Sequence, residues 1–126
     1  MGDEIQTVIY RFPKKNHDKM VEFSKPFTDV FRKYGVSCWG IFQLSSTKND
    51  MEFTSIAKTL SANLDEEEVW IEIFHYHDKK HKDEVMEIMK GDKNCEQGYQ
   101  QFLELITPGS KVIYGDFHRL NDLGFV

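Results

Sequence analysis

Three of the five histidines in the chain, His75, His77 and His81, lie within seven residues of one another. Alternate residues of a strand share a face, so His75 and His77 would lie about 7 Å apart, with His81 in the first turn of the next helix. Three histidines and an open fourth position are how catalytic zinc is held. The alternative, which we favour, is that these histidines pack and hydrogen bond where a strand meets a helix, because no carboxylate or thiolate is spaced to complete a site. We therefore predict no metal and no cofactor, and keep the three histidines as a secondary candidate.

Glu72 is a carboxylate of the same strand that could act as a general base. It alternates with three aromatic residues, Trp70, Phe74 and Tyr76. Desolvation in a cleft formed by aromatic side chains would raise the pKa of this carboxyl group toward neutrality, which suits proton transfer. The alternative is that Glu72 lies near the rim of the sheet, either solvated or paired with Arg11 or Lys111.

In the last strand-like segment, Tyr114, Asp116 and His118 are alternate residues and would share one face of the strand. A carboxylate beside an imidazole can orient it for acid-base work, so Asp116 and His118 are further catalytic candidates. The alternative is a solvated edge strand, where charged side chains discourage pairing with other chains.

Aromatic side chains near these candidates could line a cleft for a small, partly apolar molecule. The residues that we predict to line it are Trp39, Trp70, Phe74, Tyr76 and Tyr114. A pocket of roughly 300 Å³ or more would favour ligand binding, whereas a filled interior would favour a structural core.

The local patterns place these residues in a regular order of elements. Runs of β-branched and aromatic residues predict strands at 5–12, 36–44, 69–77 and 111–120. Helical spacing and capping residues predict helices at 16–35, 53–60 and 78–91, and one from 94 to the stop at Pro108. Pro26 predicts a kink in the first helix rather than two helices. The order is that of the α+β, ferredoxin-like split βαβ fold, an antiparallel sheet with helices on one face, within a single domain of residues 1–126.

One face of such a sheet has no helices and must be covered in another way. The strands carry apolar residues on both parities, for example Ile71 and Ile73 against Trp70 and Phe74. We therefore predict a homodimer, sheet against sheet, with a barrel-like interior. We expect Val69, Ile71 and Ile73 to face the helices. The alternate residues of the same strand, which include Glu72, should face the dimer interior.

Composition limits the classes of partner. The formal net charge of −5 disfavours nucleic acid and anionic membrane surfaces as partners. No apolar run approaches the roughly 20 residues that span a bilayer. Cys38 and Cys95 form no CxxC pair, and the start of the chain shows no secretory signal. We expect a cytoplasmic protein.

Short motifs along nearly the whole chain resemble one family. They are Pro13-Lys14-Lys15-Asn16, Tyr34-Gly35, Tyr76 followed by His81-Lys82-Asp83, and Ile113-Tyr114-Gly115-Asp116-Phe117. In this order they resemble the YbaA-like family, domain of unknown function 1428. The resemblance implies a ferredoxin-like, dimeric α/β-barrel and implies no particular reaction. The chain departs from the family pattern at Gln6, Cys38 and Ile41, where acidic residues are common in the family.

Two hypotheses about function follow. In the first, a homodimer binds a small, partly apolar molecule in an aromatic cleft, with or without cofactor-independent acid-base or monooxygenase-like chemistry. In the second, the protein is a non-enzymatic binding or regulatory module whose dimer interior is simply core. Whether the protein is an enzyme is left open by the sequence.

Overall fold

The computed structural model describes residues 4–124, in which four strands form one antiparallel sheet. The strands are β1 (Glu4–Pro13), β2 (Cys38–Gln43), β3 (Glu67–Tyr76) and β4 (Ile113–His118). Their order in the sheet is β2-β3-β1-β4, with β1 antiparallel to both of its neighbours. This is the predicted ferredoxin-like, α+β arrangement.

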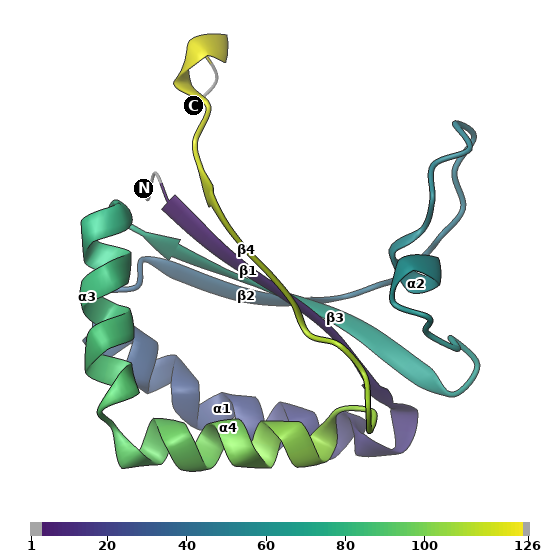
Figure 1. Cartoon of the computed structure of the whole chain (residues 1–126), viewed down its shortest axis with the longest axis horizontal. Helices are drawn as coiled ribbons and strands as arrows, with labels where there is room; N and C mark the ends of the chain where they lie inside the picture. Colours follow the sequence, from purple (N-terminus) through teal and green to yellow (C-terminus); the bar gives the residue numbers. More distant parts are fainter. Residues whose placement is uncertain (1–3, 125–126) are drawn as a thin grey trace.

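Three long helices cover one face of the sheet (Figure 1). They are α1 (His17–Lys33), α3 (Lys79–Lys90) and α4 (Lys93–Leu105), and the 3-10 turn η1 (Lys14–Asn16) leads into α1. The four-residue α2 (Ile56–Thr59) lies in the connection between β2 and β3, and the turn η2 (Asn121–Leu123) follows β4. Pro26 lies inside α1, which continues through it as one helix, as predicted.

Side-chain caps define where two of the helices begin. The carboxylate of Asp78 accepts a hydrogen bond from the backbone N–H of His81 at 2.8 Å, so α3 starts as predicted. α4 starts two residues earlier than predicted, because Asp92 rather than Asn94 is the capping residue and accepts from the N–H of Asn94 at 2.8 Å.

β3 begins two residues before its predicted start, with Glu67 and Glu68 as its first residues. Both carboxylates are buried and paired with residues distant in the chain. Glu67 accepts from Arg11 of β1 at 2.6 Å, and Glu68 lies 2.8 Å from Nδ1 of His17. These partners make it possible for two acidic residues to continue a buried strand.

The core lies between the sheet and the helices and consists mainly of aromatic side chains. One cluster packs Tyr10, Phe12 and Trp70 from the sheet against Met20 of α1 and Ile106. A second cluster, nearer α3, contains Phe31, Val36, Phe74, Tyr76 and Val85. The ring of Phe74 lies 4.9 Å from that of Phe31 in α1, centroid to centroid.

The predicted assignment of the two sheet faces is therefore wrong and is reversed in the structure. Trp70, Glu72 and Phe74 face the helices, while Ile71 and Ile73 lie on the face without long helices. Parity identified which residues share a face, but burial on the helix side was decided by the aromatic residues of α1 and α4, which pack against aromatic residues of the strands.

The face away from the long helices, called here the open face, carries apolar side chains. Its members in β1 and β3 include Ile5, Ile9, Val69, Ile71 and Ile73, and the outer strands add Phe42, Ile113 and Phe117. Phe42 and Phe117 are each 56% exposed. α2 approaches one end of this face, where Ile56 lies near Ile9 and Ile71 around a small pocket.

Within residues 4–124, no helix combines the length and the apolar composition needed to cross a bilayer.

Candidate functional site

Glu72 lies at the centre of the helix-covered face and receives two hydrogen bonds. The hydroxyl of Tyr10 in β1 donates to Oε2 at 2.5 Å, and Nε1 of Trp39 in β2 donates to Oε1 at 3.2 Å. The neighbouring strands thus present one donor to each carboxylate oxygen. The alternative pairing of Glu72 with Arg11 is absent, because Arg11 pairs with Glu67.

Burial shifts the acidity of this pair of residues. Desolvation raises the pKa of Glu72 above its usual range, although the hydrogen bonds from Tyr10 and Trp39 act in the opposite direction. Burial, together with the nearby carboxylate, also raises the pKa of Tyr10, which therefore stays a hydrogen-bond donor. A carboxyl group with a raised pKa can hold or release a proton near neutral pH.

A pocket of about 240 Å³, called here the inner pocket, lies between the sheet and the helices, and Glu72 is one of its lining residues. It is lined mainly by apolar side chains of α1, α4 and β3, with Glu72 as its carboxylate: Phe23, Ser24, Phe27, Phe31, Trp39, Phe74, Met89, Cys95, Gly98, Tyr99 and Phe102. Trp39 and Phe74 form a stacked pair in its wall, with their ring planes 9° apart. The inner pocket is therefore lined mainly by aromatic side chains, and Glu72 is the one carboxyl group among its lining residues.

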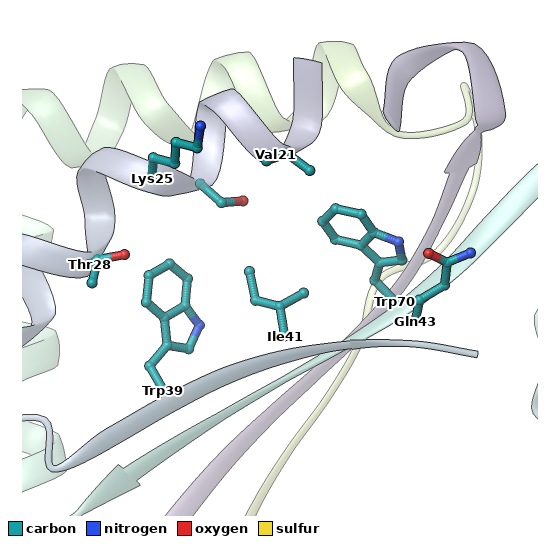
Figure 2. A pocket seen from close by; sticks show the side chains of 8 residues that line it. Val21, Lys25, Thr28, Trp39, Ile41, Gln43 and Trp70 are labelled. Carbon is teal, nitrogen blue, oxygen red and sulfur yellow. The ribbon is translucent and has the colours of Figure 1, made fainter. Parts of the chain in front are cut away.

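A second pocket of about 400 Å³, called here the outer pocket, lies between α1 and β2. Its lining residues are Val21, Ser24, Lys25, Thr28, Trp39, Ile41, Gln43 and Trp70. Figure 2 shows the two indole rings on either side of Ile41, with Lys25 on the helix above. Ser24 and Trp39 line both pockets, so the outer and inner pockets are neighbours.

Trp70 is held in the outer pocket by an ionisable pair. Its Nε1 donates to Oε1 of Glu68 at 3.0 Å, and the same oxygen lies 2.8 Å from Nδ1 of His17. The hydrogen bond to Glu68 raises the pKa of His17, whose side chain is partly exposed. The wall of the outer pocket is thus joined to a histidine at the surface.

The predicted candidates in β4 form a separate cluster, in which Lys82 takes the place expected for His118. Nζ of Lys82, a buried residue of α3, donates to Oδ2 of Asp116 at 2.6 Å, and Tyr114 donates to Oδ1 at 2.7 Å. Burial acts to raise the pKa of Asp116, but the bonds from Lys82 and Tyr114 outweigh it and lower the pKa. Among the described residues, no hydrogen bond joins Asp116 to His118, which is exposed on the edge strand.

The three candidate metal ligands do not converge. His75 lies on the open face opposite Ile5, whereas His81 faces α1. Both ring nitrogens of His81 are used, since Nδ1 accepts from the backbone N–H of His77 at 3.1 Å and Nε2 lies 2.9 Å from the carbonyl oxygen of Tyr34. No group of three metal-binding side chains is arranged around a common point in the described part of the chain.

Of the predicted lining residues, the structure brings Trp39, Trp70 and Phe74 together at the two pockets. Tyr76 is fully buried and donates to Gln6 at 3.0 Å, and Tyr114 belongs to the cluster of Asp116. These two tyrosines line neither pocket.

Two contributors were missed by the sequence reasoning. Tyr10 could have been found, because it alternates with Val8 and Phe12 on a strand predicted to neighbour that of Glu72. Lys82 gave no usable signal, because it lies in a basic run that is typical of a solvated helix surface.

Residues 4–104 match a sequence family described as protein of unknown function, DUF1428. No curated protein matches the chain.

Several solved structures are similar to the chain at low sequence identity. The protein At3g17210 from Arabidopsis thaliana is 12% identical, with a TM-score of 0.61, over 94% of this chain and 96% of that chain. SnoaB, a cofactor-independent oxygenase from Streptomyces nogalater, is 13% identical with a TM-score of 0.43, over 96% and 97% of the two chains. A nitrogen regulatory PII-like protein from Thiomonas intermedia is 14% identical with a TM-score of 0.35, over 94% of each.

Proposed function

This chain belongs to the DUF1428 family of proteins of unknown function, and we propose from its own site that it binds a small, partly apolar molecule in the neighbouring outer and inner pockets. The molecule would place a hydroxyl or amide group near Glu72 and an aromatic or aliphatic part against Trp39 and Trp70. Ligand sites are commonly apolar pockets with a few placed polar groups, and these two pockets match that description.

The observation that carries the proposal is the environment of Glu72. A carboxyl group that served only the fold would be expected to be solvated or paired with a cation, because burial of a charge is costly. Glu72 instead has two neutral donors, Tyr10 and Trp39, and opens into the inner pocket. A ligand group can complete its hydrogen bonding.

Of the chemistries considered from the sequence, proton exchange has the clearest support in this geometry. Glu72 in its ionised form would accept a proton from a bound hydroxyl or activated C–H group, and in its protonated form would return it. The donors Tyr10 and Trp39 hold the carboxylate in one orientation during this exchange.

We also propose that the open face is covered by a second copy of the chain, giving a homodimer. The support is the exposed apolar surface of the open face, which presents Phe42 and Phe117 to solvent. A face of this kind is usually an interface.

The two tryptophans give a direct test of ligand binding. They are the only tryptophans in the chain, both line the outer pocket and Trp39 also lines the inner pocket, so tryptophan fluorescence reports on the two pockets. We expect 4-nitrophenol to quench this fluorescence saturably, and Glu72→Gln to weaken its binding about tenfold, which corresponds to about 1.4 kcal/mol. Bound 4-nitrophenol should also stay protonated to a higher pH than the free compound, because a phenolate beside Glu72 is disfavoured.

Glu66→Gln is the matched control, since Glu66 is an exposed carboxylate outside both pockets. It should leave both quenching and the absorbance of the bound nitrophenol unchanged. Linear, non-saturable quenching of the wild-type protein, or equal affinities for wild type and Glu72→Gln, would contradict the proposal.

A further inference from the structure

The connection between β2 and β3, residues 44–66, is much longer than the fold requires. Antiparallel neighbours can be joined by about 2–5 residues. Here the connection contains only α2 as regular structure, and residues 44–55, called here the arm, have none. Long irregular loops in compact domains usually carry a function.

The tip of the arm is a defined turn that holds two large apolar side chains in solvent. Oδ1 of Asn49 accepts from the N–H of Met51 at 3.1 Å and of Phe53 at 2.9 Å, and Nδ2 donates to the carbonyl of Phe53 at 3.1 Å. Met51 is 72% and Phe53 68% exposed, more than any other large apolar side chain among residues 4–124. The turn between them places Glu52 at a φ of 59°. The chain therefore orders this tip without burying it.

The base of the arm is continuous with the open face. A pocket of about 230 Å³ lies between them, with walls from both: Ile9, Gln43, Leu44, Ser45, Ser46, Ile56, Val69 and Ile71. In Figure 1 the arm extends from the side of the sheet opposite to α1 and α4. A molecule seated on the open face would therefore lie beside the arm.

The arm would enlarge the surface that the open face can bury in a dimer. The strands of the sheet have 10, 6, 10 and 6 residues, which at a rise of about 3.3 Å and a spacing of about 4.8 Å gives a planar projection of about 500 Å². A standard interface buries about 800 Å² of accessible surface on each partner. An aromatic side chain such as that of Phe53 buries about 150–250 Å² when enclosed, and Met51 adds a second exposed apolar side chain.

We propose that the arm of each subunit clasps a second copy of this chain, burying Met51 and Phe53 against it. The inference rests on the proposed homodimer and adds a segment outside the sheet to its interface. In a two-fold dimer the same arm acts twice, so each contact is gained in duplicate. Asp50 and Glu52 flank Met51 and disfavour insertion of the tip into an anionic membrane.

Sedimentation of the full chain over a range of concentrations tests the proposal. We expect a dimer for the wild type, and a dissociation constant raised at least tenfold in Met51→Ser/Phe53→Ser. The matched control is Ile88→Ser/Leu103→Ser, which removes exposed apolar side chains from α3 and α4 and should leave the constant unchanged. Circular dichroism of each variant confirms that the fold is retained.

A photo-crosslinking residue gives an independent measurement that does not depend on weakening the dimer. Phe53→p-benzoylphenylalanine should yield covalent dimers on irradiation, and the same substitution at Ile88 should not. A wild-type dimer that is unaffected by the arm variant and forms no adduct at position 53 overturns the arm contact while leaving the homodimer intact. A monomeric wild type overturns both, and binding of the wild type to phosphatidylcholine vesicles through Met51 and Phe53 assigns the arm to a membrane instead.

Discussion

At the residue scale, the notable group is the carboxylate of Glu72, which is partly buried, has no cationic partner among the described residues and lines the inner pocket. Glu72 is flanked by aromatic rings and bonded by Tyr10 and Trp39, whereas the buried Glu67 has a guanidinium partner, Arg11, and a hydroxyl partner, Thr107. Burial acts to raise the pKa of Glu67, but its hydrogen bonds outweigh that effect and lower it. The same residue type thus has opposite shifts on one strand. Burial dominates at Glu72, whereas at Glu67 the hydrogen bonds from Thr107, Asn63 and Arg11, together with the charge of Arg11, outweigh burial.

Glu72→Gln should change how stability depends on pH. The folded pKa of Glu72 is above its unfolded value, so the folded state binds the proton more tightly and stability falls as pH rises between the two values. The window opens near pH 4.3, at about the ordinary glutamate pKa, and extends to the raised value. Urea unfolding of wild type and variant across this range should show a difference in unfolding free energy that shifts in favour of the variant as pH rises. A difference that is constant with pH would show that Glu72 does not titrate in this way.

At the scale of elements, the inner pocket depends on how closely α4 approaches α1. A Cβ atom placed on Gly98 of α4 would lie 2.6 Å from Cζ of Phe27 in α1. Because that ring also lines the inner pocket, a larger residue at position 98 can be accommodated only by moving the ring or separating the helices. The glycine therefore sets both the helix spacing and the space beside Glu72.

Gly98→Ala should narrow the inner pocket. Overpacking costs about 1–3 kcal/mol, partly offset by up to about 1 kcal/mol from the better helix propensity of alanine, so the loss in unfolding free energy should be modest. Affinity for 4-nitrophenol, followed by tryptophan fluorescence, should fall more clearly than stability. Gly91→Ala is the control, since its nearest neighbour would lie 3.9 Å away, and it should leave affinity unchanged. Equal affinities for the two variants would show that Phe27 does not move toward Glu72.

At the scale of the whole molecule, the two faces of the sheet differ in what covers them. The helix side holds Glu68, Glu72 and the ion pair of Lys82 and Asp116, which connects α3 to β4. The open side presents isoleucine and phenylalanine side chains, which a single subunit covers only at the end near α2. The proposed ligand site and the proposed interface are consequently on different faces, so we expect that either can be changed without altering the other.

Ile73→Asp, at the centre of the open face, should convert the proposed homodimer into monomers. An unpaired charge buried between two sheets costs several kcal/mol, and the two-fold symmetry would introduce it twice. Sedimentation should show the monomer, while tryptophan quenching by 4-nitrophenol should persist because the pockets lie on the other face. Ile88→Asp on α3 should remain dimeric. A dimer that survives Ile73→Asp would mean that the subunits meet elsewhere.

The sequence by itself determined the order of elements, the residues that share a strand face and the aromatic surroundings of Glu72. These features follow from periodicities of two and 3.6 residues and from capping chemistry, which act over a few residues. Lys82 shows where such reasoning ends, because its position in a basic run gave no sign of its bond to Asp116, 34 residues away.

Only the tertiary structure decided which face of the sheet is covered by helices. Parity divides a strand into two sets of side chains, but which set is buried depends on what packs against it from distant parts of the chain. For Glu72 that packing supplied Tyr10, 62 residues earlier, and Trp39, 33 residues earlier. The carboxylate was therefore predictable as a residue among aromatics, while its partners and its pocket arose from long-range contacts.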